Sequence, residues 1–170
     1  MAGKLIGVVM IICGCGGMGW SIAAAFRREE AALRQMIGAL DYMECELQYH
    51  LTPLPDLCRQ AGRETKGISA EVLTVLAAEL ESQIQPDVGS CMEGVLLRFG
   101  EIPGKVRNAF ELMGTSLGRF DMEGQIRGLE MVRSFCRREL EEMGRNRESR
   151  LRSYQTLSLC AGAALAILFV

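Results

Sequence analysis

Residues 5–26 read LIGVVMIICGCGGMGWSIAAAF, and none of them is charged. A helix over this run is about 33 Å long at about 1.5 Å per residue, which is enough to cross the roughly 30 Å hydrocarbon core of a bilayer. A second uncharged run covers residues 153–170. Between the runs, residues 27–152 hold every acidic residue of the chain and every Lys or Arg except Lys4. The sequence therefore predicts one polar domain, residues 27–152, between transmembrane helices at 5–26 and 153–170.

The basic residues predict which side of the membrane the domain occupies. Beyond the runs there is only Lys4 with the amino terminus, whereas many basic residues flank the runs on the domain side: Arg27, Arg28, Arg34, Arg133, Arg137, Arg138, Arg145, Arg147, Arg150 and Arg152. Because Lys and Arg concentrate in cytoplasmic segments, we expect the domain in the cytoplasm and both termini across the membrane. A signal peptide cleaved at residues 23–25, or a lipid attached within residues 12–15, would instead export the domain. The arginines that directly follow the run disfavour both.

The composition offers little for chemistry. A net charge of −2 at pH 7 does not favour binding to nucleic acid. The seven cysteines form no C-x-x-C pair and His50 is the only histidine, so the spacing matches no zinc or redox site. No phosphate-binding loop, dinucleotide fingerprint or nucleophile elbow occurs. We predict no catalytic, cofactor-binding or metal-binding residue, and we expect the cysteines to act as small apolar side chains in a reduced domain.

Apolar residues recur at three- and four-residue steps through the domain, which is the period of amphipathic helices. Such stripes predict helices over residues 27–50, 54–61, 69–84, 88–99, 106–117 and 122–152. The predicted fold class is therefore all-α, a membrane-anchored bundle of about six soluble helices. No Gly or Pro separates the first or the last of these helices from the adjacent run. We expect these two to pair antiparallel as a stalk, with the four shorter helices at its membrane-distal end.

Residues that favour helix starts mark the boundaries between these helices. Thr52 with Pro53, Ser69, Asp87 and Asp121 are predicted N-caps, because a short polar side chain can accept a hydrogen bond from a free backbone N–H of the first turn. The glycines at both ends of residues 62–67 predict a loop there.

Two charged residues fall within the apolar stripes. Glu44 lies between Leu40 and Leu47 in the first helix, and Arg133 lies near Leu129 in the last. If the stalk helices pair, Glu44 and Arg133 lie at similar heights and can form a buried pair that fixes helix register. Alternatively, Glu44 turns to the edge of the stripe and reaches water. A catalytic role for Glu44 lacks a second acid, a nucleophile or a metal at suitable spacing.

Other rows of residues suggest contact surfaces. The first helix carries a second, weaker apolar strip, which can face a partner or pack within the bundle; its members are Ala31, Gly38, Tyr42, Cys45 and Tyr49. Small residues repeat every four positions in the runs: Cys13, Gly17, Ser21 and Ala25 in the first, and Ser158, Gly162 and Ala166 in the second. Such rows allow membrane helices to approach closely.

Two stretches together resemble a known family. The first is Ala39-Leu40 followed by Glu44-x-Glu46-x-x-Tyr49-x-x-Thr52-Pro53-Leu54, and the second is Leu117-Gly118-x-x-Asp121-x-x-x-Gln125 before the last long helix. Both resemble the signature of the stage III sporulation protein AB family, and the chain length and the two terminal runs agree with it.

The resemblance implies a component of the membrane complex that endospore-forming bacteria assemble between mother cell and forespore. The family's domain is similar to the cytoplasmic domain of the inner-membrane platform protein of type II secretion and type IV pilus systems. By that analogy the chain couples a secretion-type ATPase, stage III sporulation protein AA, to the other channel subunits. It would lie in the mother-cell membrane facing the forespore, with its domain in the mother-cell cytoplasm.

Among the matched residues, Glu46 and Tyr49 lie off the main stripe, so we expect them, with Arg63, to contact a partner. Gln125 borders the stripe of the last helix and is expected to bond inside the bundle. The leading interpretation is a non-enzymatic platform or adaptor that uses no nucleic acid and no small-molecule substrate. A membrane-anchored scaffold or receptor unrelated to sporulation is the alternative, and an enzyme ranks third.

Overall fold

The computed structural model describes residues 2–50, 52–82, 87–118 and 121–169, and the side chains within 24–145 of these. The described residues form six helices and no strand, which confirms the all-α fold class. The helices are α1 (Ala2–Tyr49), α2 (Leu54–Glu64), α3 (Gly67–Ser82), α4 (Val88–Arg98), α5 (Gly104–Ser116) and α6 (Met122–Phe169).

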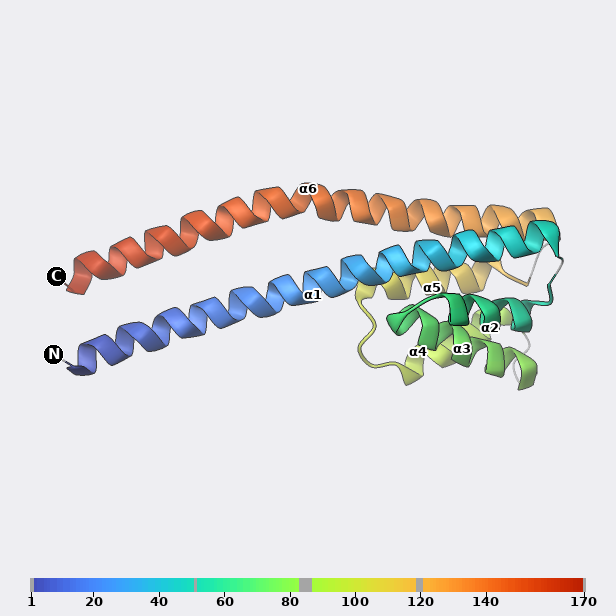
Figure 1. The fold of residues 1–170 in the computed structure, drawn as a ribbon, viewed down its shortest axis with the longest axis horizontal. Coiled ribbons are helices and arrows are strands. Elements are labelled where there is room, and N and C mark those ends of the chain that lie inside the picture. Colours follow the sequence, from blue (N-terminus) through green and yellow to red (C-terminus); the bar gives the residue numbers. More distant parts are fainter. Residues whose placement is uncertain (1, 51, 83–86, 119–120, 170) are drawn as a thin grey trace.

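The two long helices organise the molecule. Figure 1 shows α1 and α6 side by side over the bundle, with α2 to α5 packed beside them at one end. Both long helices continue out of the bundle in the same direction, so the two termini lie at the same end of the molecule (Figure 1). Each long helix is unbroken from the bundle outward, as expected from the sequence. We call α1 and α6 together the stalk, and the bundle end far from the termini the distal end.

The predicted spans fall outside the described side chains, except for residues 24–26. Where side chains are described, no helix has a stretch both long and apolar enough to cross a membrane. The domain boundaries at residues 26 and 153 stay predictions.

The stripes read from the sequence form the core. Leu33, Met36, Leu40 and Met43 of α1 are at most 1% exposed. Burying a large aliphatic side chain contributes about 1.5–3 kcal/mol relative to leaving it in water. The stripe of α6 is buried as well, at Leu129, Val132, Cys136 and Met143. The short helices add fully buried residues of their own, including Leu57, Leu76, Leu96 and Phe110.

Two predicted caps are present, and a glycine turn precedes the second of them. Asp87 accepts a hydrogen bond from the backbone N–H of Ser90 at 3.0 Å, and Asp121 accepts one from that of Gly124 at 3.0 Å. Gly118, between α5 and α6, has a φ of +77°, a left-handed conformation that glycine adopts without steric cost. A Cβ at this position would also collide with the side chain of Val88.

Two other predicted caps are wrong. No side chain caps α2, which begins at Leu54 after Pro53, and the Thr52 hydroxyl instead donates to Oε2 of Glu46 at 3.1 Å. Ser69 lies inside α3, because that helix begins two residues earlier at Gly67, whose φ is +64°. The buried hydroxyl of Ser69 has no hydrogen-bond partner among the described residues.

The predicted loop at residues 62–67 is shorter than expected. Helix α2 continues to Glu64, so only Thr65 and Lys66 separate it from α3. Gly62 is buried against α3, since a Cβ there would lie 2.8 Å from Oγ1 of Thr74. This glycine permits close helix packing and does not form a turn.

Candidate functional site

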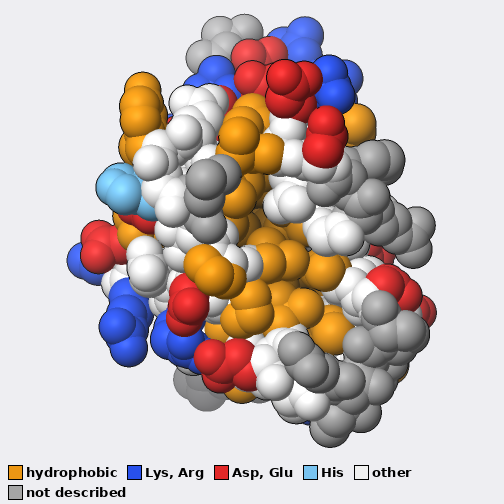
Figure 2. Space-filling model, turned by 90° about the vertical axis from the view of Figure 1, so that its right-hand side faces the viewer, with side chains coloured by type: hydrophobic (Ala, Val, Ile, Leu, Met, Phe, Trp, Pro, Cys, Tyr) orange, Lys and Arg blue, Asp and Glu red, His pale blue; other side chains and the backbone are white. Residues whose placement is uncertain are grey.

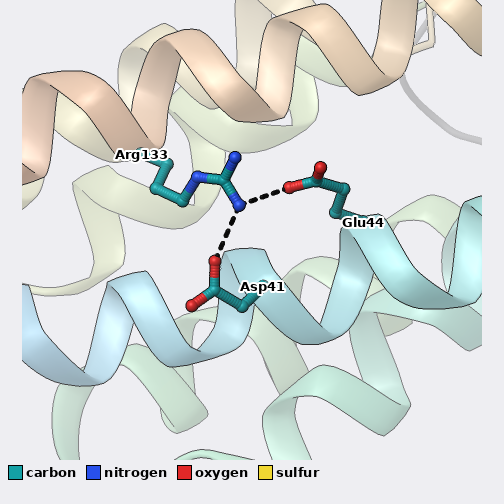
Figure 3. A network of polar contacts seen from close by, with 3 residues as sticks. All are labelled: Asp41, Glu44 and Arg133. Atoms are coloured by element: carbon teal, nitrogen blue, oxygen red, sulfur yellow. Dashed lines mark hydrogen bonds and ion pairs between the residues drawn. The ribbon is translucent and has the colours of Figure 1, made fainter.

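The structure brings Arg133 and Glu44 together across the stalk. Nη1 of Arg133 lies 2.6 Å from Oε2 of Glu44 and 2.9 Å from Oδ1 of Asp41 (Figure 3). Glu44 and Asp41 are three residues apart on α1, so both carboxylates lie on one helix face, within reach of one guanidinium from α6. We call these three residues the stalk bridge. Sequence reasoning missed Asp41, although its spacing from Glu44 could have indicated it.

The stalk bridge is partly buried. The side chains of Arg133 and Glu44 are 24% and 16% exposed, whereas that of Asp41 is 49% exposed. The Arg133 pKa is raised by its hydrogen bond to Asp41 and by the negative charges of Glu44 and Asp41, which outweigh the lowering effect of burial. Arg133 is therefore a permanent cation, and the bridge suits holding two helices rather than transferring protons.

The stalk bridge also relates the two ends of the predicted domain. Glu44 lies 17 residues beyond Arg27 on α1, and Arg133 lies 19 residues before Arg152 on α6. At about 1.5 Å per residue these stretches measure about 26 Å and about 29 Å along their helices. The same stretch measured to Asp41 is about 21 Å, so the bridge fixes a register in which the domain-side ends of the two uncharged runs lie within about 3–8 Å of the same height.

The three residues expected to contact a partner do not form one surface. Glu46 accepts the Thr52 hydroxyl at 3.1 Å and lies 3.5 Å from Nδ1 of His50, so it fastens the connection between α1 and α2. Tyr49 is 75% exposed at the end of α1. Arg63 is exposed in the last turn of α2, about 13 Å along that helix from its start.

The second apolar strip of α1 is divided between the bundle and the surface. The Tyr42 hydroxyl donates to Oε1 of Gln60 on α2 at 3.0 Å, and the Tyr42 pKa is raised by burial and then by the charge of Glu46. The remaining members are exposed: Ala31, Gly38, Cys45 and Tyr49. Tyr42 therefore belongs to the bundle, and the exposed members leave one face of α1 open.

A polar contact that the sequence did not reveal ties α5 to both stalk helices. The helix α5 follows Pro103 and has no cap from its own N-cap side chain. Instead, Oε1 of Glu29 on α1 accepts a hydrogen bond from the backbone N–H of Lys105 at 3.3 Å. Nζ of Lys105 in turn lies 2.6 Å from Oε2 of Glu139 on α6. Residues 29 and 105 are too distant in sequence for any local pattern to relate them.

Three of the four cysteines whose side chains are described are buried. Cys58, Cys91 and Cys136 are buried, and Cys45 is exposed. Burial raises the pKa of the Cys58 and Cys136 thiols to about 12, so both are protonated and unreactive at neutral pH. No group of three or more metal-ligating side chains occurs within the described part of the chain.

The remaining residues of interest lie in two places. Gln125 is half-buried in the first turn of α6, where its backbone N–H donates to the carbonyl of Asp121 at 3.0 Å. Of the residues expected to pack within the membrane, Ala25 is exposed. The others lie outside the described side chains: Gly17, Ser21, Ser158 and Gly162.

Comparison with known proteins identifies the family. The family model for stage III sporulation protein AB matches residues 4–170. The chain belongs to the stage III sporulation protein AB family. This confirms the resemblance seen in the sequence and indicates a role in sporulation.

A solved structure of stage III sporulation protein AB shares the fold. It superposes with a TM-score of 0.57 at 15% identity, over 69% of this chain and 94% of that one. At this identity the match shows a common fold alone. No curated protein sequence matches the chain.

Proposed function

We propose that this chain is a non-enzymatic membrane platform of the secretion-like channel between mother cell and forespore. It would couple a cytoplasmic secretion-type ATPase, stage III sporulation protein AA, to the membrane subunits. Both terminal runs would cross the mother-cell membrane that faces the forespore, and residues 27–152 would lie in the mother-cell cytoplasm. Membership in a sporulation family favours this function over a scaffold or receptor unrelated to sporulation.

The proposal rests mainly on one observation: both long helices leave the bundle in the same direction, and the part of each that lies far from the bundle is an uncharged run (Figure 1). The stalk bridge supports it further, because it sets the domain-side ends of the two runs within about 3–8 Å of the same height. Two helices of one domain that both enter a membrane must reach its surface at similar heights, whereas the two helices of a soluble stalk need not. The arginines beside the runs support the cytoplasmic orientation.

The distal end suits contact with the ATPase. Figure 2 views this end and shows apolar side chains gathered at its centre. A Cβ on Gly118 would touch both Val88 and Leu54, so the starts of α2 and α4 meet there. Met122, at the start of α6, is 41% exposed, and Tyr49 is 75% exposed at the end of α1. Exposed apolar groups of this kind commonly mark protein interfaces.

Photocrosslinking in sporulating cells tests this proposal. A benzophenone amino acid would replace Tyr49, and in a matched control it would replace Leu97, which is equally exposed in the last turn of α4. We expect an adduct with the ATPase from position 49 and none from position 97. An ATPase adduct from position 97 alone, or from neither position in cells that form spores normally, contradicts distal docking. Arg63 provides a third position, at the opposite end of α2.

A further inference from the structure

One connection of the bundle lies level with the end of the first uncharged run. The loop between α4 and α5, residues 99–103, lies at the bundle end that faces the termini (Figure 1). It borders a shallow depression against the start of the polar part of α1, lined by Ala25, Phe26, Arg28, Glu29, Glu101, Ile102 and Pro103. The loop therefore contacts α1 where the run at residues 5–26 ends.

The other connection at this bundle end lies further from that point. Gly67, the first residue of α3, packs against Gln35, since a Cβ on Gly67 would lie 2.8 Å from Oε1 of Gln35. Gln35 is nine residues beyond Phe26 on α1, which is about 13 Å along the helix. If the first run crosses a membrane, the loop at residues 99–103 lies at its surface, and the turn at Gly67 does not.

Hydrogen bonds hold this loop in place. Nη2 of Arg107 donates to the carbonyl oxygens of Leu96 at 3.1 Å and Phe99 at 3.0 Å, which satisfies free acceptors at the end of α4. Glu29 accepts the N–H of Lys105 just after the loop. The loop is thus fixed both to its own helices and to α1.

The side chains around the loop suit a lipid headgroup layer. Leu97, two residues before the loop, is 79% exposed, and Phe99 is half-buried. Arg28 of α1 is exposed and lines the depression, its neighbour Arg27 is exposed as well, and Glu101 is an exposed acidic residue in the loop itself. The acid Glu29 and the base Lys105 already bond to protein groups. Exposed apolar side chains and exposed arginines at one end of a bundle favour an anionic bilayer surface over water.

We propose that loop 99–103 rests on the anionic phospholipid surface, beside the point where α1 enters the bilayer. The inference rests on the membrane anchoring in the proposed function. Two helices alone would let the bundle rock about the line that joins them. A third contact beside that line resists the rocking and holds the distal end at a defined angle to the membrane.

Depth-dependent quenching in the full-length protein tests this inference. A fluorescent amino acid would be placed at Glu101, Lys66 or Gln48, in vesicles of phosphatidylglycerol and phosphatidylethanolamine that contain a headgroup-quencher lipid. We expect fluorescence loss to be largest at position 101, smaller at position 66 near the turn to α3, and absent at position 48 toward the distal end. A probe at Met18 with an acyl-chain quencher reports on anchoring separately.

The outcomes separate the two proposals. In one outcome, the probe at position 18 loses fluorescence while the probe at position 101 loses no more than the probe at position 48. This result overturns the loop contact and leaves the anchoring intact. No loss at 18 overturns both. Replacing phosphatidylglycerol by phosphatidylcholine should reduce the loss at 101, and an unchanged loss would contradict the anionic preference.

A charge placed at the loop provides a second test. Leu97→Glu adds an acid at the proposed surface and should reduce the loss at position 101. Met131→Glu makes the same kind of change at an exposed apolar residue of α6. This matched control should leave the loss unchanged, and equal effects of the two variants would overturn the loop contact.

Discussion

Removing the cation of the stalk bridge is the most direct perturbation of the stalk. In Arg133→Met, the aliphatic part of the side chain is largely kept, and two carboxylates lose their partner. The Glu44 side chain is 16% exposed, so its carboxylate is poorly solvated once it has lost Arg133. The Asp41 side chain is half-exposed, so its carboxylate remains hydrated in the variant. The cost should therefore come mainly from Glu44.

The magnitude lies between two limits. Exposed ion pairs contribute about 0.2–1 kcal/mol, and breaking a fully buried pair costs about 3–5 kcal/mol. For the partly buried pair of Glu44 with Arg133 we expect a coupling energy of about 1–1.5 kcal/mol. For Asp41 with Arg133 we expect less than about 0.5 kcal/mol, because solvent screens the half-exposed carboxylate.

Two double-mutant cycles measure these coupling energies, Glu44→Gln with Arg133→Met and Asp41→Asn with Arg133→Met. Denaturant unfolding of the full-length chain in detergent, followed by helical circular dichroism, gives the change in unfolding free energy. Additive effects of Glu44→Gln and Arg133→Met would refute the reasoning. So would a larger coupling for Asp41 than for Glu44, since burial would then not govern the strength of the bridge.

Four further experiments test separate features of the fold. Gly118→Ala should lower the unfolding free energy by at least about 1–2 kcal/mol, because of the left-handed backbone and the collision with Val88. Gly144→Ala in an open, exposed part of α6 should stabilise by up to about 1 kcal/mol. Equal effects of the two variants in denaturant melts would contradict the special role of Gly118. Maleimide at pH 7 should label Cys45 and spare Cys58, as mass spectrometry would show. Because burial raises the native Cys58 pKa to about 12, the unfolded thiol loses its proton first, and stability should fall as pH rises above about 9; flat stability between pH 8 and 10 would contradict this. Glu29→Ala should destabilise by about 1 kcal/mol through loss of the α5 cap, with faster amide exchange confined to the start of α5 as the diagnostic result.

The sequence predicted features that depend on local chemistry. The stripes of α1 and α6 follow from helical period alone, and Asp87 and Asp121 cap their helices through bonds to residues three positions later. The Glu44–Arg133 contact could be anticipated as well. Both residues interrupt an apolar stripe, and the two terminal runs supply a common origin for measuring height along each helix.

What the sequence missed depends on contacts between distant segments. Gly62 is of a residue type typical of turns, yet it lies inside α2. The helix carries a glycine there because α3 packs so closely that a side chain would not fit. Glu29 has no capping role on its own helix and acquires one only where α5 begins beside it. Ser69 shows the same limit, since a helix that starts at Gly67 buries a residue that could otherwise cap it.

The strengths of these contacts determine which motion the stalk can transmit. Sliding α1 past α6 by one turn would break the stalk bridge and displace buried residues such as Leu33 and Met36, each worth about 1.5–3 kcal/mol. Tilting the short helices against the stalk would break the Lys105–Glu139 pair, which contributes about 0–1 kcal/mol. It would also open the buried core that the short helices share with the stalk. Both motions therefore disturb the core, so the stalk and the short helices should move as one body under a load applied at the distal end.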